Sequence, residues 1–335
     1  MEQVRPPGPP PAVVRDLPAR RLPVPTTVSP RMQALIARQL DPAFNAVPPT
    51  PEAWKARIET ADRNVVAAIG GLREELGVSV EPTSVGGVGA FLVTPKVLPE
   101  SRREVILLHL HGGVRVFNGG EAGTREAILM AGLGGFKIIS VDYRMPPDFP
   151  FPAASDDALA AYRGLLRTTK ANRIGLLGSS AGGSLVYVTL LRARTEGLPM
   201  PGAVATGSPT VDLSGAGDSL ATHAGVDNVL GTHEGFVAAT ARLYAAGRDL
   251  RDPLLSPIYG DVAGFPPAIL TSGTRDLYLS NTVRMHRKLR AAGVEAVLQV
   301  WEGQAHVQYL ADAAAPETKE YHEEVALFLD RHLSS

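Results

Sequence analysis

Cysteine is absent from this chain of 335 residues. The protein therefore has no disulfide, no thiolate metal ligand and no cysteine nucleophile. The chain also has no excess of one charge, because it contains 33 Lys and Arg and 34 Asp and Glu, which give a formal net charge of -1. We expect neither nucleic acid nor an anionic membrane surface as a partner, since both attract proteins through basic fields.

Long uninterrupted hydrophobic runs are missing as well. No stretch approaches the ~18 apolar residues of a membrane span. Prolines and charges also interrupt every candidate for the apolar part of a secretion signal. The sequence therefore predicts a cytoplasmic protein without a membrane span. Hydrophobic residues still make up 44% of the chain, which is enough for a large buried core.

Proline is unevenly distributed, with 12 of its 28 residues in the first 50 positions. Because proline fixes φ and lacks an N–H, residues 1–29 are predicted to form an extended arm. Apolar residues at helical spacing then predict two helices, over residues 31–39 and 51–69. We assign both to an N-terminal cap covering residues 30–69.

Further along the chain, short apolar runs alternate with helical patterns. This alternation predicts an α/β fold with a mostly parallel central sheet flanked by helices. It stops over residues 212–250, which we interpret as an insertion contributing to the cap, so that residues 70–211 and 251–335 form the core. The expected strands are residues 88–93, 105–110, 137–141, 174–177, 203–206, 268–272 and 296–300, and the expected helices are 121–133, 153–166, 181–196, 281–292 and 318–332.

The sharpest local motif is a G-x-S-x-G sequence over residues 178–182, directly after a predicted strand and before a predicted helix. At such a turn Gly178 and Gly182 permit the tight backbone that lifts the hydroxyl of Ser180 above the sheet. The motif alone also fits a glycine-rich turn capped by serine. Its position between strand and helix favours a nucleophile.

A serine hydroxyl needs a base, and the base needs an orienting acid. Asp276 follows one late predicted strand, and His306 follows the last one. The chain order Ser180, Asp276, His306 is the order that the α/β-hydrolase architecture requires. Taken singly, Asp276 also fits a turn carboxylate and His306 a solvated loop residue.

A third motif, His111-Gly112-Gly113-Val114, follows the predicted strand 105–110. Glycines without Cβ let backbone N–H groups turn towards an oxyanion. We therefore predict Gly112 and Gly113 as oxyanion donors, together with the N–H of Ala181 after the nucleophile. A tight turn with no ligand is the alternative for an isolated Gly-Gly pair.

Together these motifs resemble the hormone-sensitive-lipase-like branch of the α/β-hydrolases, which are bacterial carboxylesterases with an N-terminal helical cap. The resemblance spans about residues 85–310 in the family's order. It implies an α/β-hydrolase fold, the triad Ser180, Asp276 and His306, and the same oxyanion donors. The segments that carry it are residues 111–113, 142–147, 151–154, 178–183, 208–213, 252–257 and 273–276.

The chain departs from the family pattern at three places. Val114 stands where the family has a third glycine, Ser179 replaces the usual aspartate before the nucleophile, and Val307 follows His306 where the family has glycine. None of these removes a catalytic group. The two valines are expected to narrow the site, and the predicted substrate pocket comprises Val114, Ser179, Val307, Tyr309 and Trp54. For Trp54 the alternative, core packing of its ring at helical spacing, is the favoured one, and the same alternative stays open for Tyr309.

We therefore predict a serine carboxylesterase that hydrolyses small to medium acyl esters through an acyl-enzyme, with no metal or other cofactor. The leaving group stays open, because a lactone or amide hydrolase would use the same triad. A non-catalytic small-molecule receptor on this fold is the alternative from another class. It is disfavoured because all three triad residues are present. Oligomeric state is equally open, with a homodimer among the candidates.

Overall fold

A computed structural model describes residues 15, 16, 18, 19 and 21–333. Most of the arm predicted for residues 1–29 therefore lies outside the described residues. Over residues 21–29 the backbone forms neither helix nor strand. Helix α1 (Pro30–Ile36) follows directly, capped by the side chain of Ser29.

Within the described residues, eight strands form one sheet in the order β1-β2-β4-β3-β5-β6-β7-β8. From β4 to β8 in this order, each strand runs parallel to the next one. Strand β2 pairs antiparallel with both β1 and β4. The mostly parallel sheet of the sequence prediction is thus confirmed. The strands are β1 (Val78–Val85), β2 (Val88–Pro95), β3 (Ile106–Leu110), β4 (Ile138–Val141), β5 (Ile174–Ser179), β6 (Ala203–Gly207), β7 (Ala268–Gly273) and β8 (Ala296–Trp301).

Strand β1 is the one strand that the sequence did not predict. It lies at the edge of the sheet, and only Val78 and Val80 among its residues are buried. Pro82 within the strand lacks a donor for the ladder, which is tolerated at an edge. By contrast, every residue of β5, β6 and β7 is buried, which explains their continuous apolar runs.

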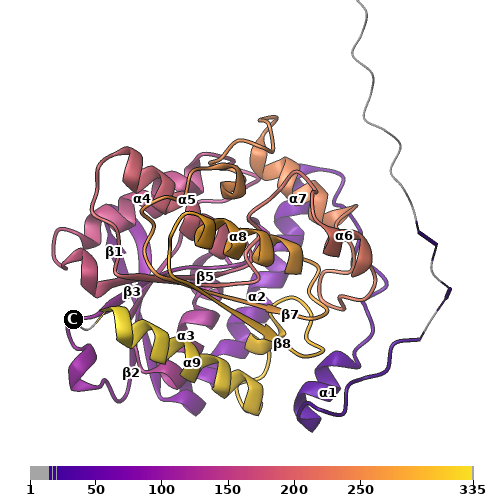
Figure 1. Ribbon diagram of the computed structural model, residues 1–335, viewed down its shortest axis with the longest axis horizontal. Helices are drawn as coiled ribbons and strands as arrows, with labels where there is room; N and C mark the ends of the chain where they lie inside the picture. Colours follow the sequence, from indigo (N-terminus) through magenta and orange to yellow (C-terminus); the bar gives the residue numbers. More distant parts are fainter. Residues whose placement is uncertain (1–14, 17, 20, 334–335) are drawn as a thin grey trace, which may run out of the picture.

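Helices cover both faces of the sheet (Figure 1). On one face α3 (Arg125–Gly134) and α9 (Pro316–Leu333) bury residues such as Leu129 and Phe328 in a shared core. On the other face three helices bury Leu159, Val186 and Met285 in a second core. These are α4 (Ala153–Leu165), α5 (Ala181–Thr195) and α8 (Leu279–Ala291).

Two predicted helices differ from the observed ones by more than three residues at one end. Helix α2 (Pro51–Leu76) continues past the predicted end at residue 69 and stops at Gly77, whose φ of 62° favours glycine. The predicted boundary between cap and core thus falls inside α2, whose Ile69 is buried in the core beside α3. The expected helix 121–133 is divided into a 3-10 turn and α3. The 3-10 turns are Glu100–Arg102, Gly120–Thr124, Ala171–Arg173, Pro257–Tyr259 and Gln308–Leu310.

The insertion predicted over residues 212–250 carries α6 (Asp218–Thr222) and α7 (Phe236–Ala245), which lie close together in Figure 1. It packs on the N-terminal segment, since the N–H of Phe236 donates to Oδ1 of Asn45 at 2.7 Å. The ring of Phe236 also stacks on Trp54 of α2, with 5.5 Å between centroids. Two segments far apart in the sequence therefore build one structure.

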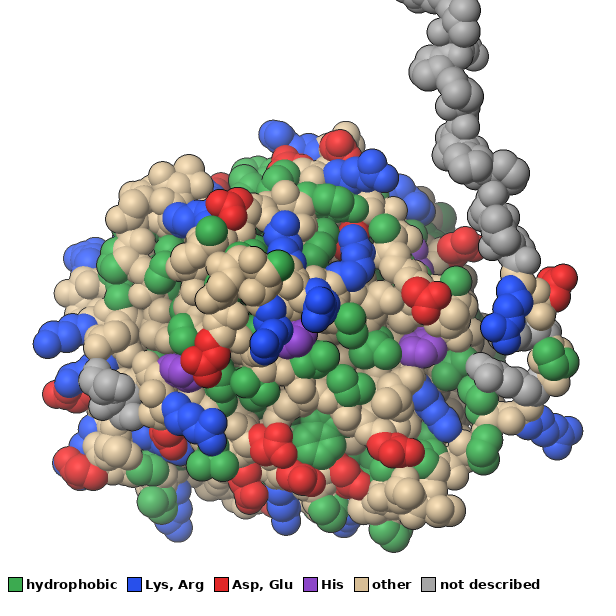
Figure 2. All heavy atoms as spheres, in the orientation of Figure 1, with side chains coloured by type: hydrophobic (Ala, Val, Ile, Leu, Met, Phe, Trp, Pro, Cys, Tyr) green, Lys and Arg blue, Asp and Glu red, His purple; other side chains and the backbone are tan. Residues whose placement is uncertain are grey.

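The outer surface carries charges of both signs. Figure 2 shows Lys and Arg interspersed with Asp and Glu over the visible face, as the formal net charge of -1 suggests. In the described part of the chain no helix has both the length and the apolar character needed to cross a membrane.

Candidate active site

Ser180 occupies the turn between β5 and α5. Its φ of 56° and ψ of -121° lie outside the regions that a non-glycine residue usually adopts, as expected for a strained strand-to-helix turn. The flanking glycines are required by close approach. A Cβ added to Gly178 would lie 2.5 Å from the carbonyl oxygen of Leu110, and one added to Gly182 only 1.8 Å from the same atom.

The structure brings Ser180, His306 and Asp276 into one hydrogen-bonded chain. Oγ of Ser180 lies 2.9 Å from Nε2 of His306, and Nδ1 of His306 lies 3.0 Å from Oδ1 of Asp276. Asp276 also accepts from the hydroxyl of Ser272 at 2.7 Å and from the N–H of Tyr278 at 2.8 Å. Because an ionised carboxylate only accepts, Nδ1 of His306 carries the proton and Nε2 is free to accept from Ser180.

Burial and neighbouring charge shift the pKa values of His306 and Asp276 in opposite directions. Burial disfavours the imidazolium of His306, but the charge and hydrogen bond of Asp276, with the charge of Asp227, raise its pKa above the usual 6.5. Burial likewise favours the protonated form of Asp276, yet His306 and the hydrogen bonds from hydroxyl groups hold its pKa below 3.8. The chain is therefore arranged as carboxylate, imidazole and hydroxyl.

The loop after β3 lies against the turn at Ser180. A Cβ at Gly112 would lie 3.0 Å from the carbonyl oxygen of Ser179 and 3.3 Å from the Cβ of Ser180, so any other residue would push the loop away from this turn by a few tenths of an ångström. Gly113 has a φ of 117°, and a Cβ there would lie 2.4 Å from the carbonyl oxygen of Phe117. Gly113 thus lies where only glycine fits, and Gly112 lies where glycine allows the closest approach to Ser180.

Surrounding side chains fix this loop. Nδ1 of His111 lies 2.8 Å from the carbonyl oxygen of Gly112, and burial lowers the pKa of His111 to about 4, so its ring is neutral. The His111 ring stacks on Tyr143, whose hydroxyl donates to the His111 carbonyl at 2.5 Å. From α2, Asp62 accepts the N–H groups of Asn118 and Gly119 at 2.6 and 3.0 Å.

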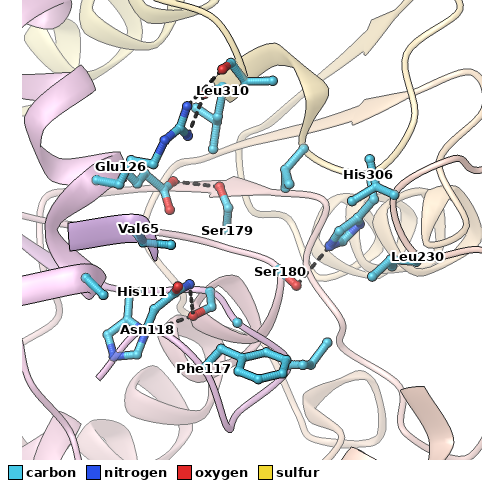
Figure 3. Close-up of a pocket in the computed structure, with 18 of the residues that line it drawn as sticks. Val65, His111, Phe117, Asn118, Glu126, Ser179, Ser180, Leu230, His306 and Leu310 are labelled. Carbon is cyan, nitrogen blue, oxygen red and sulfur yellow. Dashed lines mark hydrogen bonds between the residues drawn. The ribbon is translucent and has the colours of Figure 1, made fainter. Parts of the chain in front are cut away.

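A cavity of about 610 Å³ opens at Ser180 and His306. Figure 3 places Glu126 and Val65 on one side of Ser180, and Leu230 on the other. The lining is mostly apolar and draws on both the core loops and the two cap segments. From the cap come Asp41, Phe44, Arg57, Val65, Val229, Leu230, Phe236 and Val237.

Three of the five predicted pocket residues line this cavity, namely Val114, Ser179 and Val307. Trp54 and Tyr309 do not. The ring of Trp54 instead stacks on the Phe236 ring within a small apolar cluster. Tyr309 is completely buried beneath the site, where its hydroxyl lies 3.0 Å from that of Ser208 and its ring contacts Tyr321.

Sequence reasoning missed several residues at the site. Glu126 on α3 accepts from the hydroxyl of Ser179 at 2.6 Å, and its other oxygen lies 3.2 Å from Nε2 of His109. Asp62 and Phe236 come from the cap, and their contacts depend on how the cap packs. Of these residues, only Glu126 could have been suspected from the sequence, because it closely follows Gly119, Gly120 and Gly123 after the predicted oxyanion loop.

Comparisons with known proteins agree with this fold. A family model described as "alpha/beta hydrolase fold" matches residues 107–310. An "Acetyl-hydrolase" of Streptomyces hygroscopicus is 32% identical over 224 residues, which cover 67% of this chain and 74% of that relative. The solved structure of an esterase E25 is 43% identical, with a TM-score of 0.92, and covers 96% of this chain and 99% of its own.

A further solved structure, titled as an esterase from the bacterial hormone-sensitive lipase (HSL) family, is 30% identical with a TM-score of 0.71. The match covers 84% of this chain and 98% of that structure. The chain belongs to the bacterial hormone-sensitive-lipase-like carboxylesterases. The family resemblance and the α/β-hydrolase fold expected from the sequence are thus confirmed.

Within this esterase family, the departures at Val114 and Val307 have a common structural feature. Both residues have positive φ, at 47° and 50°. A β-branched residue is strained in this region, whereas the family's glycine is not. Both side chains also line the cavity beside Ser180. At the third departure, the hydroxyl of Ser179 donates a hydrogen bond to the carboxylate of Glu126.

Proposed function

We propose that this protein hydrolyses carboxylic esters through the triad Ser180, His306 and Asp276 and a covalent acyl-enzyme. The observation that carries the proposal is the pair of contacts made by His306, 2.9 Å to Ser180 and 3.0 Å to Asp276. Exposed fractions of 6%, 3% and 0% for the three residues mean that the chain of hydrogen bonds is shielded from competing water.

In the first half of the reaction, Oγ of Ser180 attacks the ester carbonyl carbon while Nε2 of His306 takes the hydroxyl proton. The C–O bond to the alcohol then breaks, and His306 returns the proton to the leaving alcohol. In the second half, His306 takes a proton from water, whose oxygen attacks the acyl carbon. The acid leaves and Ser180 regains its proton. Asp276 keeps the imidazole in the required tautomer and stabilises its charge.

The tetrahedral intermediates carry an oxyanion, and we assign its donors to the N–H groups of Gly112, Gly113 and Ala181. Ala181 is the first residue of α5, where N–H groups have no partner within the helix and the helix dipole favours negative charge. Gly112 lies against Ser180 itself. Fixed donors in a buried site cost no reorganisation when the charge develops.

Small to medium acyl esters fit the site best. A mostly apolar cavity of about 610 Å³ is at the scale of one small ligand, and Val114 and Val307 occupy space beside the nucleophile. A relative named as an acetyl-hydrolase supports the same substrate size. The cytoplasmic location stays a prediction of the sequence, and the oligomeric state stays open, with a homodimer among the candidates.

The direct test replaces Ser180 with Ala and assays a short p-nitrophenyl ester. We expect kcat to fall by about 10⁴-fold or more, with the fold retained by circular dichroism. Ser184→Ala on α5, the helix that follows Ser180, removes another buried hydroxyl and is the matched control that should keep activity. Substantial esterase activity in Ser180→Ala would contradict the mechanism. Running a matched linear ester, lactone and anilide on the wild type then defines the leaving group.

A further inference from the structure

Asp227 is a completely buried carboxylate in the cap insertion, between α6 and α7. Its two oxygens accept four backbone N–H groups. Oδ1 accepts from Val229 at 2.8 Å and from Leu230 at 2.9 Å, which closes a turn within the insertion itself. Oδ2 is directed elsewhere, because it accepts from Leu277 at 2.8 Å and from His306 at 3.2 Å.

The second pair of contacts links two separate loops. Leu277 directly follows Asp276 on the loop after β7, and His306 lies on the loop after β8. A single carboxylate oxygen therefore bridges the two segments that carry the acid and the base. An aspartate needed only for a local turn would use one oxygen and leave the other to solvent, whereas Asp227 has no exposed atom.

We propose that Asp227 is a positioning residue for ester hydrolysis, holding the loops after β7 and β8 at the separation that lets Asp276 and His306 form their hydrogen bond. This inference rests on the triad proposed above. It gives the insertion a second task, since the segment that lines the cavity with Leu230 also fixes the geometry beneath it.

Neighbouring residues of the insertion contact the same loops. Nδ1 of His223 lies 2.8 Å from the carbonyl oxygen of Asp276, and the hydroxyl of Ser219 donates to the carbonyl of Leu277 at 2.8 Å. Asn228 accepts from Nε2 of Gln308 at 2.8 Å, two residues after His306. The contacts of Asp227 are thus the centre of a wider attachment between the insertion and the triad loops.

Asn228 extends this attachment to the N-terminal cap segment. Its Nδ2 donates to the carbonyl oxygens of Leu35, Ile36 and Arg38 at 2.9 to 3.2 Å. The side chain of Gln308 in turn accepts from the N–H of Ala305, next to His306. Both cap segments therefore reach the loop of the catalytic histidine through two adjacent residues of the insertion.

Asp227 also acts on His306 through its charge. Burial and the nearby Asp276 raise the pKa of Asp227, while N–H donors at both oxygens favour the ionised form. The groups facing His306 are Asp276, Asp227, the hydroxyl of Ser180 and the ring of Tyr278, 5.6 Å away between centroids. Removing the charge of Asp227 therefore lowers the pKa of His306.

The test compares Asp227→Asn with Asp212→Asn in the full-length protein. Asp212 is the matched control, because it is another completely buried carboxylate of the insertion, but its oxygens accept from Ser214, Tyr259 and Arg284 instead of from the triad loops. In Asp227→Asn an amide N–H₂ must face backbone N–H donors, so the loops shift. We expect kcat to fall by about 100-fold, the cost of a small misplacement of reacting groups, with KM within about twofold.

The pH profile separates positioning from a general loss of stability. Activity needs neutral His306, so kcat/KM rises with pH through the pKa of His306. Loss of the negative charge in Asp227→Asn should move this acidic limb to lower pH by about half a unit. Asp212→Asn should lower the melting temperature to a similar degree but leave both kcat and the limb unchanged.

A second variant covers the case in which Asp227→Asn does not fold. His223→Ala removes a bond to the Asp276 loop from a partly exposed position and should lower kcat by about 3- to 10-fold with KM unchanged. Wild-type kcat and an unmoved limb in folded Asp227→Asn, or wild-type kcat in His223→Ala, would overturn the inference. Ser180→Ala run alongside keeps the two proposals apart, because its activity reports on the triad alone.

Discussion

The floor and the roof of the active-site cavity are built by different means. The floor consists of the loops after β3, β5, β7 and β8, which are connected by hydrogen bonds such as the two at His306. The roof comes from α2 and the insertion, where the ring of Phe236 stacks on Trp54 of α2 and also on Phe117, which the loop after β3 supplies. Arg57 covers the same Phe236 ring, with its guanidinium carbon 4.2 Å from the centroid.

This difference separates chemistry from selectivity. Directional bonds hold reacting groups to a fraction of an ångström, which catalysis requires. Apolar packing holds shape without such precision and can vary with little cost to the fold. The carboxylates Asp62 and Asp227 cross this division, because they belong to the roof but bind backbone N–H groups of the floor.

The largest effect on activity is expected when a hydrogen-bonded residue of the floor is replaced. Asp276→Asn should lower kcat by about 10⁴-fold, because an amide at this position stabilises the wrong tautomer of His306 and leaves its imidazolium uncompensated. Steady-state kinetics on a short ester measure the loss, and circular dichroism controls for folding. A loss below tenfold would mean that Asp276 does not orient the base.

Replacement of an apolar residue of the roof should change substrate preference instead. Phe236→Ala removes the ring at the centre of the apolar stack, so we expect KM for a hexanoyl ester to rise about tenfold through lost apolar contact. The kcat for an acetyl ester should stay within about twofold. The acyl-chain series from acetyl to octanoyl provides the measurement. An equal fall in kcat for all chain lengths would mean that the roof also sets the chemistry.

The smallest effect is expected where floor and roof meet. Val114→Gly removes a side chain from the cavity wall and relieves a β-branched residue at a φ of 47°. We expect kcat/KM to rise about threefold for esters of branched acids or alcohols and to change little for the acetyl ester. Ratios of kcat/KM between the two substrates give the result. No change in this ratio would show that Val114 does not limit the pocket.

The sequence predicted the floor because its residues have strict local requirements. Ser180 needs Gly178 and Gly182 beside it, and these leave a readable pattern after a buried strand. The roof left no such pattern. Asp62 and Asp227 are single aspartates, in a helix and a loop, and the floor residues that they bind lie 50 to 79 residues away in the chain.

The two aromatic pocket candidates follow the same rule. For Trp54 and Tyr309 the sequence leaves a place in the pocket and a place in the core open. Packing against Phe236 and Tyr321 decides for the core in both cases. Strand β1 escaped prediction because its exposed positions and Pro82 hide the strand pattern. In each case tertiary packing, rather than local preference, fixes the outcome.

The proposed mechanism requires that one serine in this chain be a nucleophile activated by His306. Treatment of the folded protein with a stoichiometric amount of a fluorophosphonate, followed by peptide mass spectrometry, tests this requirement. We expect one label per chain, located on Ser180, with esterase activity lost in proportion to labelling and no label in Ser180→Ala. Labelling at another residue, or full activity in a protein completely labelled at Ser180, would contradict it.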